Sequence, residues 1–149
     1  MEALRKIVAQ LKNRAKPVLE EEILNTVQEA LQVQVLKIIF QSKYGKFLSF
    51  MGGTCLRICH DMKRFSEDLD FCLDQKSPTY HFPSMMSVVE RELNLLGFAV
   101  TSRPHADKIV QKSFLRISNL QEILELSSFR KKQKLHIKIE VDIKPPLLR

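Results

Sequence analysis

The sequence has little cysteine and no long hydrophobic run, with only three cysteines among 149 residues. A membrane-spanning helix needs about 20 consecutive apolar residues, and the N-terminus has no signal-peptide core, so we expect a cytoplasmic protein. The cysteines, Cys55, Cys59 and Cys72, are odd in number and lie in apparent core elements, which predicts buried reduced thiols rather than a disulfide framework. A zinc site at Cys55, Cys59 and His60 is disfavoured because there is no CxxC pair and no evident fourth ligand.

Internal repeats and low-complexity segments are also absent, and the length suits a single domain with one hydrophobic core. Positive charge is in excess: the sequence has 24 Lys and Arg but 17 Asp and Glu, which gives a net charge of +7. Such an excess suits a polyanionic partner such as RNA, DNA or nucleotides, although a solubilising surface would have the same composition. Charge alone leaves both interpretations open.

Hydrophobic periodicity predicts an α+β (or α/β) domain in which helices flank a mixed β-sheet. Two N-terminal helices occupy residues 1–45, and the sheet core with the candidate site occupies residues 46–149. The helices are expected at 2–14, from Pro17 to about 44, at 55–60 and at 83–96, with Gly45 and Gly97 as left-handed caps. The strands are expected at 46–51, 69–73, 98–103, 109–117 and 135–143, while residues 119–128 are ambiguous between helix and strand.

A strand that runs into Gly52-Gly53-Thr54 and then into a helix carries the first chemical signal. Glycines leave the first backbone N–H groups of such a helix unobstructed, and the helix dipole favours an anion there, so this geometry suits phosphate. The segment is neither a Walker loop nor a GxGxxG fingerprint. A plain strand-to-helix turn is the alternative interpretation.

Asp68 and Asp70 are separated by one residue at the start of a strand, so their side chains project from the same face. Two carboxylates on an otherwise apolar strand repel each other and lose hydration unless a cation lies between them. Their hard oxygen ligands suit Mg²⁺ or Mn²⁺, with nucleotide phosphates completing the coordination shell. A solvated strand edge would also explain the pair.

The strand 135–143 alternates strictly between apolar and polar residues, which places Lys138, Glu140 and Asp142 on one face. An amphipathic strand with a wet face is the simple interpretation. Beside Asp68 and Asp70, however, a third carboxylate from this strand would complete a two-metal site for phosphoryl-type transfer.

The segment from Met51 to Arg57, MGGTCLR, and the segment from Arg64 to Phe71, RFSEDLDF, together resemble the AbiEii/AbiGii-type toxin family. These proteins are nucleotidyltransferases of the DNA polymerase β-like superfamily. The resemblance implies Mg²⁺-dependent transfer of a nucleotide from an NTP to an acceptor, which is a tRNA 3′ end for several members, and a cognate antitoxin partner.

The resemblance also implies roles for individual residues. Asp68 and Asp70 would hold the metals, with Glu140 as the third carboxylate and Asp142 in reserve. The triphosphate would be cradled and neutralised by residues of the first segment: Gly52, Gly53, Thr54 and Arg57. Arg64 and Ser66 would brace the loop before the acidic pair or contact the nucleotide.

Family members usually continue beyond the third acidic strand into a helical region with a catalytic-type Lys and a distal Asp. We expect this region to be absent from the present chain, which reaches only Arg149. Two alternatives therefore stay open beside the enzyme. One is a catalytically incomplete module that binds nucleotide, RNA or a partner protein, and the other is a kinase-like phosphotransferase on the same fold.

Overall fold

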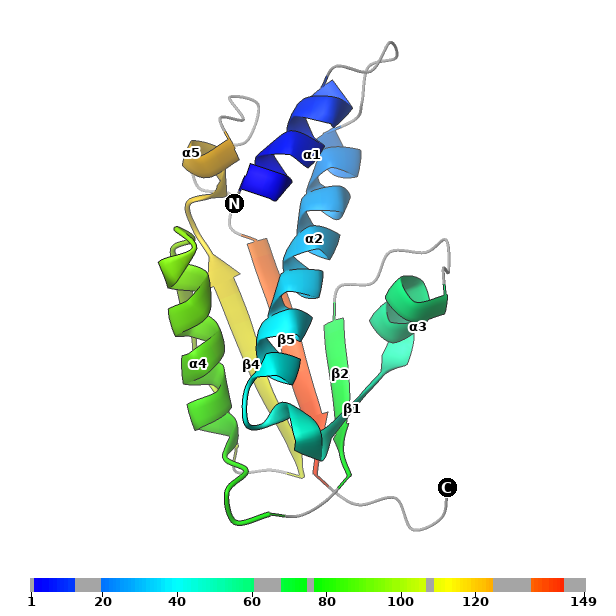
Figure 1. Ribbon diagram of the computed structural model, residues 1–149, viewed down its shortest axis with the longest axis vertical. Helices are drawn as coiled ribbons and strands as arrows, with labels where there is room; N and C mark the ends of the chain where they lie inside the picture. The colour runs from blue at the N-terminus through cyan, green and yellow to red at the C-terminus, as the bar shows by residue number, and fades with distance from the viewer. Residues whose placement is uncertain are drawn as a thin grey trace.

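The computed structural model describes residues 2–12, 20–60, 68–74, 77–106, 109–124 and 135–143. After two leading helices, strands and helices are interspersed along the chain (Figure 1). The helices are α1 (Glu2–Lys12), α2 (Glu20–Gln41), the 3₁₀ helix η1 (Gly45–Phe47), α3 (Gly52–His60), α4 (Phe82–Leu95) and α5 (Leu120–Leu124). The strands are β1 (Leu48–Met51), β2 (Asp68–Leu73), β3 (Val100–Ser102), β4 (Val110–Ile117) and β5 (Leu135–Asp142).

The strands form one five-stranded sheet in the order β1-β2-β5-β4-β3. Strand β2 pairs in parallel with β5, whereas the β1–β2, β4–β5 and β3–β4 ladders are antiparallel. Helices α2 and α4 lie across this sheet (Figure 1). The prediction of an α+β domain with a mixed sheet and two leading helices is confirmed.

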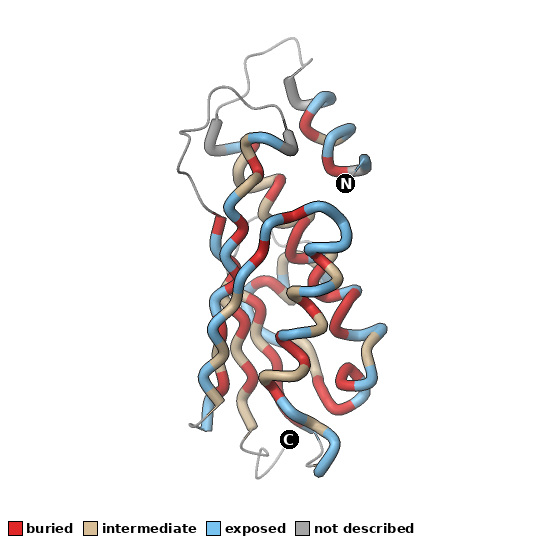
Figure 2. Tube along the Cα trace, turned by 90° about the vertical axis from the view of Figure 1, so that its left-hand side faces the viewer, coloured by how far each residue is buried: buried red, intermediate tan, exposed pale blue. Residues whose placement is uncertain are grey.

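The sheet has two different faces because its strands alternate in burial. Along β5 the residues Ile137, Ile139 and Val141 are fully buried, while the residues between them are half-buried or exposed. The buried side chains join apolar side chains of α2 and α4, such as Val35 and Met86, in one core. We call this side of the sheet the helix face and the opposite side, which carries Asp68 and Asp70, the open face. The side view shows strands on one side and helices on the other (Figure 2).

Helix α2 ends earlier than the periodicity predicted. It stops at Gln41, where the Ser42 amide bonds to the Ile38 and Ile39 carbonyls, and the 3₁₀ helix η1 follows. The prediction that Gly45 is a left-handed cap is wrong, because the glycines with positive φ are Gly52 and Gly97. A glycine is needed at position 45 for a steric reason instead, since a Cβ there would lie 2.6 Å from the Phe40 Cα.

Gly97, in contrast, has a φ of 101° directly after α4 and is the left-handed residue that the sequence predicted at this position. The expected strand 46–51 shortens to β1 because its first two residues belong to η1. The expected strand 98–103 shortens to β3. In the ambiguous segment 119–128, the described part contains the short helix α5, and residues 125–128 lie outside the described residues.

Helix α3 begins at Gly52, directly after β1, and not at Cys55 as predicted. The prediction of buried cysteines holds for Cys72 only, because Cys55 is half-buried and Cys59 is exposed. Burial and the neighbouring Cys59 raise the pKa of the Cys55 thiol, which keeps it protonated at neutral pH. Over the described residues, none of the helices has the length and apolar character that crossing a membrane requires.

Candidate functional site

Asp68 and Asp70 lie at the start of β2, and both side chains are half-buried on the open face. Strand β2 pairs in parallel with β5, which places Asp70 beside Glu140 and Asp68 beside Lys138. Paired residues of neighbouring strands project from the same face of a sheet. The structure therefore brings Glu140, which is distant in the sequence, next to Asp68 and Asp70.

The register also distinguishes the two candidates for the third carboxylate. Asp142 is paired with Cys72, two residues further along the ladder than Glu140. Two residues along a strand correspond to about 6.6 Å, so Asp142 lies farther from Asp70 than Glu140 does. Glu140 is thus the better-placed third carboxylate.

A lysine on the same face already pairs with Glu140. The Nζ atom of Lys138 lies 2.6 Å from Oε1 of Glu140, and this contact raises the pKa of Lys138. Both side chains are partly exposed, which allows the pair to open toward a ligand. The alternation of β5 had already placed Lys138 and Glu140 on the same face.

The environment of Asp70 disfavours the charged form of its carboxyl group. Burial raises its pKa most, and the negative charges of Glu140 and Asp68 and a hydrogen bond with Glu140 raise it further. A carboxylate whose charged form is disfavoured in this way gains from a nearby cation. Lys138 lowers the pKa of Asp70 but does not cancel these effects, so the negative charge at Asp70 is only partly compensated.

The carboxylates of Asp68, Asp70 and Glu140 are chemically suited to a divalent cation, but their present arrangement suits one less well. Carboxylate oxygens are the ligands that Mg²⁺ and Mn²⁺ prefer. Yet within the described ranges no group of three or more His, Cys, Asp or Glu side chains is arranged to hold a metal ion. Asp68 and Asp70 are the pair that fits, and Glu140 joins them only by releasing Lys138.

Gly52 forms the wall beside Asp70. Its φ is +83°, a conformation that residues with a Cβ rarely adopt. A Cβ at this position would also overlap Oδ2 of Asp70 and lie 3.1 Å from its Cγ. The first glycine is therefore needed both for the turn from β1 into α3 and for the close approach to Asp70.

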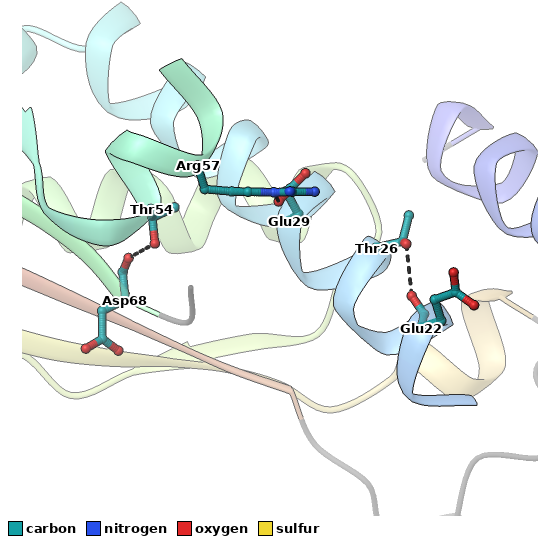
Figure 3. Close-up of polar contacts among 6 residues, drawn as sticks. All are labelled: Glu22, Thr26, Glu29, Thr54, Arg57 and Asp68. Atoms are coloured by element: carbon teal, nitrogen blue, oxygen red, sulfur yellow. Dashed lines mark hydrogen bonds and ion pairs between the residues drawn. The ribbon is translucent and has the colours of Figure 1, made fainter. Parts of the chain in front are cut away.

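Thr54 is buried, with 1% of its surface exposed, and its hydroxyl donates a hydrogen bond to the backbone carbonyl of Asp68 (Figure 3). The bond ties the first turn of α3 to the start of β2. Thr54 thus positions the acidic pair through the backbone, whereas the sequence had suggested a ligand of the triphosphate.

Arg57 extends from α3 toward α2, where its Nε atom lies 2.7 Å from Oε2 of Glu29. Figure 3 shows this side chain directed at Glu29 and away from the carboxylate of Asp68. No sequence pattern indicated Glu29 as the partner of Arg57, because the contact joins residues 28 positions apart. Arg64 and Ser66 lie outside the described residues.

Three comparisons with known proteins bear on this arrangement. Residues 34–149 match the family model described as "Nucleotidyl transferase AbiEii toxin, Type IV TA system". A search of curated proteins gave no match.

Two solved structures from Helicobacter pylori share the fold. One, assigned as a nucleotidyltransferase, has a TM-score of 0.56 and 18% identity, covering 85% of this chain and 47% of its own. The other, JHP933, has a TM-score of 0.55 and 18% identity, with 85% and 46% covered. The chain spans about half the length of these structures.

Proposed function

Because the chain belongs to the AbiEii family of nucleotidyl transferase toxins, we propose that it transfers a nucleotide from an NTP to the hydroxyl of an RNA acceptor. The observation that carries the proposal is the meeting of Asp68, Asp70 and Glu140 on the open face, with Gly52 against Asp70. The match to the family model includes all four residues.

In the proposed reaction the acceptor oxygen bonds to the α-phosphorus as the bond from that phosphorus to the β-phosphate oxygen breaks. Pyrophosphate leaves, and the proton of the hydroxyl passes to a carboxylate oxygen of the acidic group or to water. Asp68 and Asp70, with Glu140 third and Asp142 in reserve, would hold Mg²⁺ or Mn²⁺, which supplies charge that offsets the triphosphate. Thr54 keeps Asp68 in position through its hydrogen bond to the backbone.

Gly52 and Gly53 form the first turn of α3 beside the acidic pair. The free amides of a helix N-terminus bind phosphate, so we place the triphosphate there. Arg57 reaches it only by leaving Glu29, and Arg64 and Ser66 are proposed to contact the nucleotide or brace the loop before Asp68. The family description names a toxin–antitoxin system, so we propose an antitoxin partner as well, and the cytoplasm as the place where NTP and tRNA meet the enzyme.

The test is to incubate the protein with each α-labelled NTP, Mg²⁺ and total RNA, and to follow where the label goes. We expect label in RNA, with tRNA as the candidate acceptor, and a loss of at least about 100-fold in Asp68→Asn and Asp70→Asn. Asp74→Asn is the matched control, because Asp74 is exposed just beyond the other end of β2, where it bonds to Ser49.

Two outcomes would contradict nucleotidyl transfer. NTP binding without any transfer of label would show a catalytically incomplete binding module. Transfer of label from a γ-labelled but not from an α-labelled NTP would show a phosphotransferase.

A further inference from the structure

A second feature of the open face lies on β3, β4 and β5, beyond the acidic pair. It is a cavity of about 600 Å³ whose lining includes Arg103, His105, Phe114, Arg116 and His136. We call these five residues the basic strip.

The register explains why these side chains share one face. Arg116 is paired with His136 on one side and with Thr101 on the other. The bridge between His105 and Lys112 continues the β3–β4 ladder in the same register, which places Arg103 across from Phe114. Paired residues project to the same side, so the strip is a continuous row over three strands.

The strip is positively charged, and no carboxylate lines the cavity among the described residues. The Nε atom of Arg116 donates a hydrogen bond to Nε2 of His136 at 3.3 Å, so a histidine and not an acid orients this guanidinium. Within the described part of the chain, neither Arg103 nor Arg116 forms an ion pair. Two arginines left without acidic partners in a cavity suit an anionic ligand such as phosphate.

Phe114 provides a flat apolar surface in the middle of this charge. Its side chain is 49% exposed although it lies on a central part of β4, and Nζ of Lys138 is 5.9 Å from the ring centroid. An exposed aromatic ring between cations is the arrangement that stacks the bases of single-stranded nucleic acid. An acidic protein segment would use the charge but would not require the ring.

The strip lies at a useful distance from the acidic pair. Lys138 is paired with Asp68 on one side and with Phe114 on the other, so Phe114 is two strands away from Asp68. Two strand spacings amount to about 10 Å, which is the reach of one or two nucleotides of an extended strand. A strand bound over Phe114 could therefore present its end at Asp68 and Asp70.

We propose that the basic strip is the acceptor subsite and binds the single-stranded end of an RNA. Phe114 stacks a base, while Arg103 and Arg116 hold the adjoining phosphates. The proposal rests on the proposed function, because it assigns the acceptor side of the same site. In the proposed function the triphosphate binds on the other side of the acidic pair, where Gly52 lies against Asp70.

The test measures the Kd of a fluorescent ten-nucleotide single-stranded RNA by anisotropy at several salt concentrations. Phe114→Ala should weaken binding by about 10-fold or more, as expected for the loss of one stacked base. Arg116→Ala should weaken it several-fold and lower the slope of log Kd against log salt by about one. Phe114→Trp should retain the affinity.

Two variants on the other side of the sheet are matched controls. Arg91→Ala removes an exposed arginine of α4, and Leu95→Ala removes its most exposed apolar side chain. Both should bind RNA as the unmodified protein does. An equal loss of RNA affinity in Arg91→Ala and Arg116→Ala would overturn the proposal, because RNA binding would then follow net charge alone. Unchanged RNA affinity in Phe114→Ala would also overturn it.

Binding of NTP with Mg²⁺, followed by calorimetry, separates this inference from the proposed function. Retained NTP binding in Arg116→Ala together with weakened RNA binding supports the subsite. Loss of both ligands, or competition of NTP with RNA for the strip, would overturn it. If the strip binds RNA but no label is transferred, the strip is still an RNA-binding site, and nucleotidyl transfer is refuted.

Discussion

Gly52 occupies the point where the chain leaves β1, begins α3 and passes the Asp70 carboxylate. Gly52→Ala would place a Cβ in a left-handed backbone conformation and against Oδ2 of Asp70. We expect it to lower the free energy of unfolding by about 1–3 kcal/mol. Urea unfolding followed by circular dichroism measures the change.

Gly53→Ala is the control for this prediction, because Gly53 lies in α3 without a positive φ. Alanine is favoured over glycine in a helix by about 1 kcal/mol at most, so this variant should be as stable as the parent protein or more so. Equal losses in the two variants would show that the conformation of Gly52 is not the cause.

A substitution at Asp70 is expected to raise stability, whereas Gly52→Ala is expected to lower it. Burial and the charges of Glu140 and Asp68 raise its pKa, so its charged form destabilises the metal-free fold at neutral pH. Asp70→Asn should therefore raise the melting temperature in EDTA by a few degrees, while it abolishes transfer. The gain should fade as the pH falls through the raised pKa, because Asp70 is then neutral in both proteins. A lower melting temperature at pH 7 would contradict the electrostatic account.

The face on which a residue lies was predictable from the sequence where the residue belongs to a periodic strand or helix. The period of two along a strand put Asp68 with Asp70, and Glu140 with Asp142, on common faces. The partners of Thr54 and Arg57 were not predictable, because they are set by packing between elements distant in the chain. Both residues belong to the recognised motif, yet both side chains bond within the fold.

At the scale of elements, long periodic segments were predicted well and junctions were not. Helix α4 and strand β5 match their predicted ranges to within one residue at each end. The region 42–54 differed, because a 3₁₀ turn and a helix that starts on two glycines have no simple hydrophobic period. The neighbours of each strand also could not be read from the sequence, and the pairing of β2 with β5 came only from the fold.

The contact between α3 and α2 allows a test at this scale. The Arg57–Glu29 ion pair is partly exposed, so Arg57→Ala should lower stability by no more than about 1 kcal/mol. Glu29→Gln then distinguishes two roles of Arg57. If Arg57 only holds α3, NTP affinity should be unchanged, whereas tighter NTP binding would show that Glu29 competes with the triphosphate for the guanidinium.

At the scale of the whole molecule, the sheet separates stability from binding. Its helix face packs against α2 and α4 in one continuous core, and its open face carries the acidic group and the basic strip. The net charge of +7 had left open whether the protein is merely solubilised or binds a polyanion. A cavity with two arginines and an exposed ring gives the second interpretation a specific location.

This separation predicts that truncating an apolar side chain on the helix face affects stability, whereas truncating one on the open face affects RNA binding. Met86 is fully buried on α4, so Met86→Ala should lower the free energy of unfolding by about 2–5 kcal/mol through the cavity that it leaves. Phe114 is half-exposed on β4, and Phe114→Ala should change stability by less than about 1 kcal/mol while it weakens RNA binding. Urea unfolding with an unchanged slope would show that each variant keeps one cooperative transition. If Met86→Ala weakened RNA binding under conditions where it is fully folded, the two faces would be coupled, and the open face could not be treated as an independent binding surface.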